Sequence, residues 1–313
     1  MMEKGLSCRE AFCRELAELG RKNPEIVALT SDARGSSALG VFATALPDQF
    51  IEVGIAEQNE IGMAAGLAAV GKRPYVCAPA SFLSARALEQ IKVDVAYSRM
   101  NVKLLAVSGG ISYGALGMSH HSVHDVAALR AMPGIRVILP CDEAQTVALL
   151  RGLEADDEPA YIRVGKAPMP IVYGPEAEFA VGKASRLRPG TDLTIIACGE
   201  MVYPAIEAFE QLAGEGISAQ VLDMHTLSPL DGEAIFAAAG IGPIITIEEH
   251  SVNGGLGASA ARLVVTNRPV PMRILALPET ENAISGPSGE VFRHYGLDRD
   301  GLCRAARELM KAG

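Results

Sequence analysis

The sequence predicts an α/β protein of two domains, each a mostly parallel sheet flanked by helices. Short runs of β-branched and aliphatic residues alternate with helical stretches, which is the pattern of repeated strand–helix units. The 313 residues are 49% hydrophobic but only 5% aromatic, and they include no Trp. Such a composition favours parallel strands buried on both faces. The length is about twice that of an ordinary ~150-residue domain.

The first half of the chain opens with a predicted helix, after which strands and helices alternate. Helical periodicity covers residues 8–20, 56–70, 84–97 and 142–153. Strand-like runs cover residues 26–30, 74–78, 102–107 and 136–139, and a further apolar run covers 126–130.

A break in this rhythm between residues 165 and 188 predicts a linker, because Pro168, Pro170, Gly174 and Pro175 interrupt regular structure. A second α/β unit follows. Its predicted strands are 193–197, 219–223 and 244–248, and its predicted helices are 202–213, 231–239, 256–264 and one from residue 302. We therefore expect a first domain at 1–167, a linker at 168–190 and a second domain at 191–313.

Charge and cysteine content narrow the class of protein. Lys and Arg total 28 against 37 Asp and Glu, and the net charge of −9 disfavours the basic surface of a nucleic-acid binder. The longest apolar stretch, residues 61–71, is shorter than the ~20 residues of a membrane span, and the first residues show no signal-peptide pattern. Six cysteines without a C-x-x-C spacing indicate free thiols. We expect a cytoplasmic protein that binds neither nucleic acid nor membrane.

The most informative stretch runs from Val53 to Ala68. A strand-like run ends in a turn at Gly54, and the helix that follows is rich in Ala and Gly, so another element can approach its backbone closely. Tight packing explains the small residues but not Glu57, which stands at the helix opening among apolar neighbours. The helix dipole favours an acid there, so the spacing is consistent with both a structural and a functional role.

Residues 118–125, Met-Ser-His-His-Ser-Val-His-Asp, gather polar groups next to a glycine-rich loop. His120 and His124 are four residues apart and would share a helix face, as in a two-histidine metal site. No third ligand with suitable spacing follows, so we expect no metal site here. Imidazoles titrate near neutrality, and in such a loop they favour proton transfer or contacts with sugar hydroxyls.

Two weaker signals concern anions. Arg9, Arg34, Arg163 and Lys166 stand at the ends of predicted elements, where each is most often a solvated surface charge. Residues 254–257, Gly-Gly-Leu-Gly, open a predicted helix and would suit phosphate. This run does not match the G-x-G-x-x-G fingerprint, and the chain has neither a Walker A nor a G-x-S-x-G motif.

Several short motifs occur in a recognisable order. They are Val-Gly-Ile-Ala-Glu-Gln-Asn at 53–59, Ser-Phe-Leu at 81–83, Ser-His-His at 119–121, Pro-Cys-Asp at 140–142, Leu-Ser-Pro-Leu-Asp at 227–231, and Glu-Glu-His at 248–250 before Gly-Gly-Leu-Gly. Together they resemble the C-terminal half of transketolase, which is a pyrimidine-binding domain followed by a small C-terminal domain. The resemblance covers essentially the whole chain.

The resemblance implies thiamine diphosphate as the cofactor. Enzymes of this family also need a pyrophosphate domain, in which a Gly-Asp-Gly run and a downstream Asn hold Mg²⁺ and the diphosphate, and this sequence contains no such segment. The chain therefore resembles one half of a split transketolase, whose N-terminal subunit supplies that domain and holds most of the Mg²⁺ (or Ca²⁺) ligands. In this family the cofactor lies between chains, which implies self-association in an α2β2 heterotetramer.

Matching the motifs assigns the cofactor site. Glu57 corresponds to the catalytic glutamate that contacts the aminopyrimidine nitrogen, and we expect it in an apolar pocket that raises its pKa so that it shares a proton there. Phe82 corresponds to the aromatic ring that stacks on the pyrimidine. Asp32, near the end of the first strand, and Ile55 are assigned to the same site.

The resemblance also implies a sugar phosphate site. His120 corresponds to the histidine that contacts the hydroxyls of the donor sugar and assists proton movement. Arg9, Ser36 and Arg163 correspond to positions that bind the substrate phosphate, which a guanidinium can grip bidentately. The implied reaction transfers a two-carbon ketol unit from a ketose phosphate to an aldose.

A few positions depart from the family pattern. Leu116 stands where many transketolases have an acid four residues before the active histidine, and Ser108 stands where they have a second, phosphate-side histidine. Ala85 or Leu88 replaces a further aromatic residue, so stacking would rest on Phe82. We therefore expect a donor or acceptor preference that differs from that of the pentose phosphate enzyme.

Two alternatives stay open at this point. The β subunit of a 2-oxo acid dehydrogenase E1 component has the same two domains, a similar G-I-A-E helix and a loop histidine, but the residues assigned to phosphate favour a sugar phosphate. A non-catalytic scaffold or regulatory subunit would keep the fold without turnover. The presence of Glu57, Phe82 and His120 disfavours it.

Overall fold

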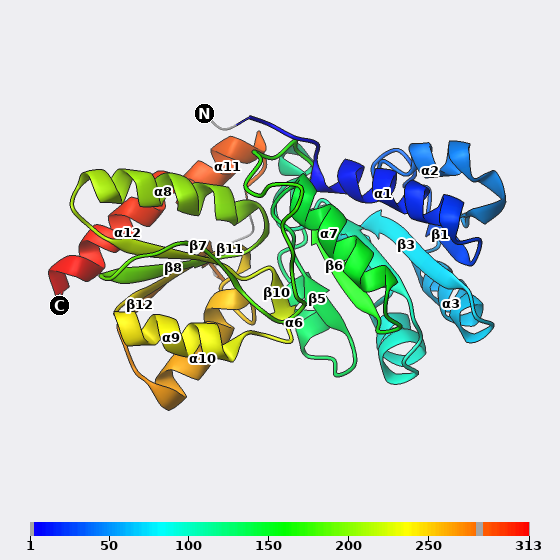
Figure 1. Cartoon of the computed structure of the whole chain (residues 1–313). Coiled ribbons are helices and arrows are strands. Elements are labelled where there is room, and N and C mark those ends of the chain that lie inside the picture. Colours follow the sequence, from blue (N-terminus) through cyan, green and yellow to red (C-terminus); the bar gives the residue numbers. More distant parts are fainter. Residues whose placement is uncertain (1–2, 280–283, 313) are drawn as a thin grey trace.

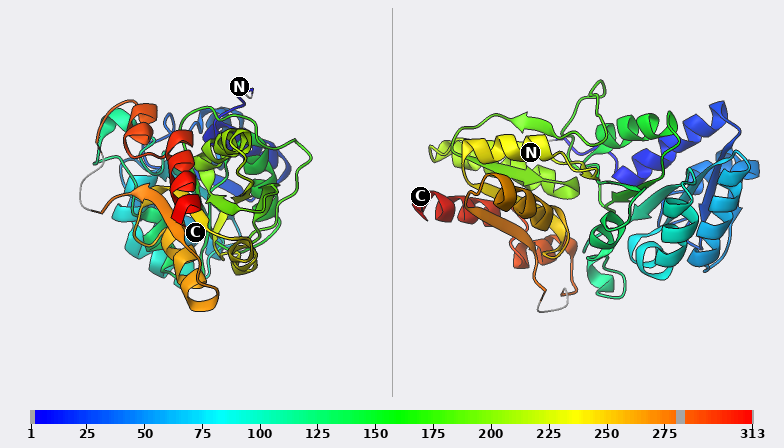
Figure 2. Two further views of the ribbon diagram at one scale, coloured as in Figure 1. Left: turned by 90° about the vertical axis from the view of Figure 1, so that its left-hand side faces the viewer. Right: turned by 90° about the horizontal axis from the view of Figure 1, so that it is seen from below.

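Two sheets organise the part of the chain that the structure describes, residues 3–279 and 284–312. In this computed structural model each sheet has helices on both faces, and the two lobes lie side by side (Figure 1, Figure 2). The predicted α/β class is confirmed. Residues 1, 2 and 313, at the ends of the expected domains, and residues 280–283 of the expected second domain lie outside the described residues.

The first sheet has seven strands in the order β10-β5-β6-β4-β3-β1-β2. The strands from the first lobe are parallel to their neighbours: β1 (Ile26–Thr30), β2 (Phe50–Glu52), β3 (Arg73–Pro79), β4 (Lys103–Val107), β5 (Arg136–Ile138) and β6 (Ala160–Val164). β10 (Thr226–Ser228) comes from the second lobe and pairs antiparallel with β5.

Helices cover both faces of this sheet because successive strand residues point to opposite sides. In β1, Ile26 and Ala28 pack toward one helix group, and Val27 and Leu29 toward the other. The first group is α1 (Cys8–Lys22), α2 (Gly40–Ala45) and α7 (Glu143–Glu154). The second is α3 (Glu57–Ala69), α4 (Ala80–Arg86), α5 (Leu88–Gln90), the π-helix η2 (Ile91–Tyr97) and α6 (Asp125–Arg130).

The second sheet has five strands in the order β12-β11-β8-β9-β7. β8 (Leu193–Ala197), β9 (Ala219–Asp223), β11 (Ile244–Ser251) and β12 (Met272–Leu277) are parallel, and β7 (Ser185–Arg188) is antiparallel to β9. α8 (Val202–Gly214), α11 (Ser288–His294) and α12 (Arg299–Ala312) contribute to the apolar packing on one face, and α9 (Gly232–Ile241) and α10 (Leu256–Asn267) cover the other. Short 3₁₀ turns lie at η1 (Pro47–Gln49), η3 (Gly114–Leu116) and η4 (Gly199–Met201).

The structure adds α2, α11 and β12, which the sequence does not predict, and it differs from the predicted elements in other places as well. The single helix predicted at 84–97 is broken into α4, α5 and η2. The sequence does not predict β6, because Arg163 interrupts a run whose five residues are all buried. The expected linker at 168–190 ends in β7, a strand of the second sheet. β10 leaves its own lobe and extends the first sheet.

None of the helices among the described residues combines the length and apolar character needed to cross a bilayer. All six cysteines are buried and unpaired, which is consistent with thiols acting as small apolar side chains.

One apolar core runs through both lobes. It includes Leu104 of β4 in the first lobe and Ile196 of β8 in the second, and Leu227 of β10 belongs to it at 1% exposure. The lobes are therefore joined by shared burial as well as by the β5–β10 pairing.

We expect Leu227→Ala to lower the free energy of unfolding by about 2–5 kcal/mol, since it opens a cavity in this shared core. The control is Val265→Ala on α10, where the side chain is 69% exposed, and it should change stability by less than about 0.5 kcal/mol. Denaturant unfolding measures both. Equal stability of Leu227→Ala and the parent chain would contradict the shared core.

Candidate active site

The carboxyl ends of β1 and β3 meet at one edge of the first sheet, where open α/β sheets place their ligands. A hollow of about 350 Å³ lies there. The side chains around it come from four segments: Asp32 and Ser36 after β1, Ile55 and Glu57 at the opening of α3, Phe82 and Arg86 on α4, and Tyr113, Leu116 and His120 in the loop after β4. The structure thus gathers six of the assigned residues at one pocket.

Glu57 begins α3, and only 2% of it is exposed. Arg86 donates to both of its carboxylate oxygens, at 2.8 Å to Oε1 and 2.7 Å to Oε2. The expected apolar environment is therefore wrong, because the carboxylate is held by a charge-assisted pair. The Arg86 side chain is itself 46% exposed, so this cation stays in contact with solvent.

Three rings form one wall of the pocket, which we call the aromatic wall: Phe82, His120 and Tyr113. The His120 ring packs edge-on between the other two, with centroids 5.3 Å from Phe82 and 5.4 Å from Tyr113. A cation lies over each outer ring, Arg86 at 4.9 Å from the Phe82 centroid and Lys166 at 5.1 Å from that of Tyr113. Packing from both sides fixes the orientation of the His120 imidazole.

The histidine loop is not helical, and this overturns the predicted shared helix face. Residues 118–124 precede α6 and form turns and bends. The Nδ1 of His120 lies 2.9 Å from the Ser119 hydroxyl, whereas the Nε2 of His124 lies 3.4 Å from that of Ser84. Among residues 3–279 and 284–312, no three His, Cys, Asp or Glu side chains are grouped to hold a metal ion.

Ser36 lines the pocket, and Arg9, which does not line it, is bonded to Ser36 from α1. Arg9 on α1 donates a short hydrogen bond to the backbone carbonyl of Ser36, and the Ser36 hydroxyl donates to the carbonyl of Ala33 at 3.0 Å. This places a guanidinium beside the hydroxyl-bearing turn that follows β1.

The glycine run at 254–257 does not form a phosphate cradle. The carboxylate of Glu248 accepts hydrogen bonds from the backbone N–H groups of Leu256 and Gly257, each at 2.7 Å, and so caps the opening of α10 from inside the protein. Burial raises the pKa of Glu248 to about 7, while these backbone bonds oppose the shift. The N–H groups at the opening of α10 therefore bind the side chain of Glu248 and are not free to bind a phosphate.

Among the described residues Arg163, unlike Arg9, has no bond to a residue that lines the pocket and does not line the pocket itself. It is 5% exposed on β6, with Nε 3.4 Å from Asp125 Oδ2 and Nη2 2.6 Å from the carbonyl oxygen of Glu249. Burial disfavours its charge, yet the carboxylates of Asp125 and Glu249 raise its pKa above the ordinary value. Arg163 is thus buried in an ion-pair cluster and does not line the pocket.

Sequence reasoning missed the site roles of Arg86, Tyr113 and Lys166. Arg86 follows Phe82 by four residues on α4, a spacing that places both on one side of a helix. Lys166, which the sequence offered only as one of several basic residues at element ends, is exposed just beyond the end of β6 and lies over the Tyr113 ring.

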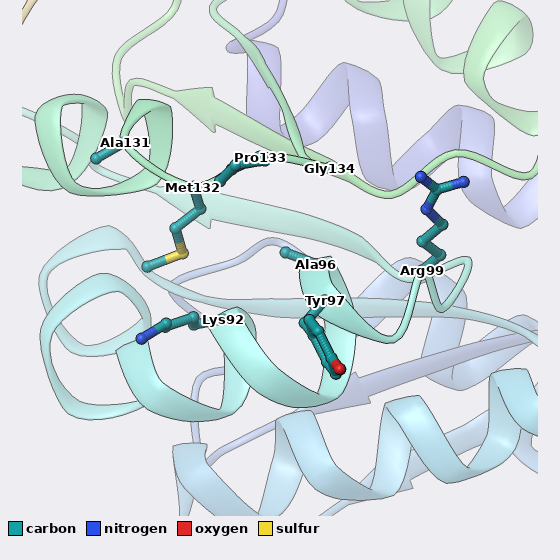
Figure 3. A pocket seen from close by; sticks show the side chains of 8 residues that line it. All are labelled: Lys92, Ala96, Tyr97, Arg99, Ala131, Met132, Pro133 and Gly134. Carbon is teal, nitrogen blue, oxygen red and sulfur yellow. The ribbon is translucent and has the colours of Figure 1, made fainter.

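A second hollow, of about 430 Å³, lies near the amino ends of β4 and β5. Figure 3 shows Lys92, Tyr97 and Met132 around it, with Arg99 to one side. None of the assigned residues lines it, and it lies at the sheet edge opposite the one where α/β proteins bind ligands. The pocket at the carboxyl edge is therefore the candidate active site.

The site combines a buried carboxylate at a helix opening with an aromatic wall. It lies at the carboxyl edge of a parallel sheet to which a small α/β lobe is attached. This combination defines the pyrimidine-binding half of a thiamine diphosphate-dependent enzyme. Residues 4–170 match the family described as "Transketolase, pyrimidine binding domain", and residues 182–302 match "Transketolase, C-terminal domain". The chain belongs to the transketolase family, whose members depend on thiamine diphosphate.

Relatives and solved structures agree with this assignment. An apulose-4-phosphate transketolase subunit of Phocaeicola vulgatus is 53% identical over 313 residues, which cover 99% of this chain and 100% of that one. The 6-deoxy-6-sulfo-D-fructose transketolase subunit SqwH of a Clostridium species is 39% identical over 96% of this chain and 94% of its own. A solved chain described as "Split gene transketolase, inactive beta4 tetramer" is 37% identical, covers 98% and 99% of the two chains, and superposes with a TM-score of 0.90.

Arg163→Ala should lower the free energy of unfolding by about 3–5 kcal/mol, because Asp125 and Glu249 would stay buried without their cation. Lys166→Ala removes an exposed cation nearby and should change stability by less than about 0.5 kcal/mol. Denaturant unfolding of the two variants gives the comparison. An Arg163→Ala chain as stable as its parent would contradict the structural role.

Proposed function

We propose that this chain is the C-terminal subunit of a two-component transketolase that moves a two-carbon ketol unit from a ketose phosphate to an aldose. The observation that carries the proposal is the pocket in which Glu57 faces the aromatic wall. The identity of 53% with a transketolase subunit over nearly the whole chain supports it.

The pocket fits the pyrimidine end of thiamine diphosphate. The Glu57 carboxylate suits a ring nitrogen, the face of Phe82 suits the ring, and Ile55 and Asp32 border the same space. When bound, this cofactor supplies the nucleophilic carbon and the electron sink for the reaction. In that reaction Glu57 holds and returns a proton at the pyrimidine nitrogen.

We assign the diphosphate and its Mg²⁺ to an N-terminal partner subunit. The support is that the described residues of this chain group no set of three acidic, histidine or cysteine side chains for a cation. α3 also presents Gly62 and Gly66 to open space, beside Met63 at 37% and Val70 at 76% exposure. An apolar, small-residue face of this kind suits close subunit contact, in keeping with an α2β2 assembly in a reducing cytoplasm.

The substrate we propose is a ketose with an anionic group remote from the reacting carbons. His120 is positioned to contact its hydroxyls, and Arg9, Ser36 and Lys166 supply donors around the pocket. Two relatives are an apulose-4-phosphate and a 6-deoxy-6-sulfo-D-fructose transketolase subunit, and both names denote a sugar that ends in an anion. Leu116 is 53% exposed at the pocket and cannot accept a hydrogen bond as an acid would. It therefore favours a sugar that needs no carboxylate contact at this position.

The two alternatives are weaker. An E1 β subunit acts on 2-oxo acids, whereas the Phocaeicola and Clostridium relatives are transketolase subunits. A scaffold would not need a carboxylate buried at the pocket with both oxygens held by one guanidinium nitrogen, as Glu57 is by Nη1 of Arg86.

The chain alone, supplied with thiamine diphosphate and Mg²⁺, should show no turnover of ketose phosphates, since the diphosphate ligands lie on the partner. Adding an N-terminal transketolase subunit should restore activity in a coupled assay. Full turnover by the single chain would overturn the two-component proposal.

Glu57→Gln should reduce kcat of the reconstituted enzyme by at least about 100-fold, because an amide cannot exchange the proton. The fold should survive, since Arg86 is half-exposed and an amide is less costly to bury than a carboxylate. Exchange of the cofactor C2 proton, followed by NMR, should slow in parallel.

The control for this substitution is Glu89→Gln on α5, an exposed glutamate that does not line the pocket and should leave both rates unchanged. Near-normal exchange of the C2 proton in Glu57→Gln would show that Glu57 has only a structural role at the N-terminus of α3.

A further inference from the structure

A second carboxyl group lies one turn along α3 from Glu57. The Glu60 side chain is fully buried, and neither of its carboxyl oxygens has a hydrogen-bond partner among the described residues. Glu57, by contrast, is neutralised by Arg86. A buried, unpaired carboxylate is costly enough that such a group normally takes up a proton instead.

The groups around Glu60 supply no cation. They are the Ser31 hydroxyl after β1, the Cys77 thiol on β3, and the carboxylates of Glu57 and Glu52. Burial raises the pKa of Glu60 to about 8, and the charges of Glu57 and Glu52 add to the shift. The nearby Ser31 hydroxyl and the Cys77 backbone oppose it by weak hydrogen bonding, although neither forms a hydrogen bond of ordinary geometry with the carboxyl group. At neutral pH the protonated acid is the major form.

Ser31 connects this acid to the pocket. It is 5% exposed, it lines the pocket with Glu57, and its hydroxyl, which lies near Glu60, makes no hydrogen bond of ordinary geometry in the part of the chain described. Two buried polar groups without partners therefore stand beneath the pocket, one on α3 and one after β1.

We propose that Glu60 is a positioning residue that remains a neutral carboxylic acid, so that the Glu57–Arg86 pair beneath the pocket stays electrically balanced. Loss of the Glu60 proton to solvent adds a negative charge one turn from Glu57 with no cation to match it. That charge destabilises the opening of α3 and with it the position of Glu57. The effect on turnover rests on the proposed function, whereas the protonation of Glu60 does not.

Thermal stability tests the protonation without any assay of activity. The folded pKa lies above the ordinary value of 4.5, so the stability linked to the Glu60 proton is complete below about pH 4.5 and is lost as the pH rises through about 8. Glutamine does not titrate. The melting temperature of Glu60→Gln relative to the parent chain should therefore rise steadily between pH 5 and 8 and then level off.

The matched control is Glu178→Gln, at an exposed glutamate far along the chain. The difference in melting temperature between this variant and the parent should not change with pH. Glu60→Met, an apolar side chain of similar length, is the second variant should the buried amide prevent folding, and it should show the same rising difference. If the melting temperature of the folded Glu60 variant differs from that of the parent by the same amount at every pH, the proposal is overturned.

The positioning role is tested with the reconstituted enzyme. The parent should lose kcat/KM above about pH 8, approaching tenfold per pH unit, whereas Glu60→Gln should lack this alkaline loss and stay within about threefold of the parent at pH 7. An identical alkaline loss in both overturns the positioning role. Absence of turnover in both refutes the proposed function, and the melting comparison then decides the state of Glu60.

Discussion

The position of the pocket depends on the ion pairing of one guanidinium that is buried between the lobes. Arg163 extends from the first sheet and meets Asp125 of its own lobe and Glu249 of the other. Because a buried charge left alone costs several kcal/mol, Arg163 must stay beside its carboxyl partners. The Cβ atom of any other residue at Gly109 or Gly110 would come within 2.0 Å or 2.3 Å of the guanidinium, so glycine is required there.

That ion-pair cluster also anchors the loop that carries the aromatic wall. The Ile111 N–H donates to Glu249 Oε1 at 2.6 Å, and Gly110 and Ser122 exchange two backbone hydrogen bonds of 2.9 Å and 2.7 Å. Tyr113 and His120 lie between these fixed points. The second lobe thus contributes to the candidate active site without lining it, by holding the loop from behind.

The two glutamates in the first turn of α3 show how environment divides one side-chain type into two states. Glu57 faces an arginine and the pocket, and Glu60 faces hydroxyl, thiol and carboxylate groups beneath it.

Local signals in the sequence were enough to establish the α/β class, most strand and helix positions, the family, and most of the residues that meet at the pocket. Apolar periodicity and short motifs are local, and the carboxyl ends of parallel strands bring the motif residues to one edge. The charge partners, in contrast, emerged only in the folded chain. Folding placed Arg86 on Glu57, left Glu60 without a cation, and buried Arg163 between the lobes beside Asp125 and Glu249. A charged side chain's role depends on what burial brings beside it, and those neighbours lie far away in the sequence.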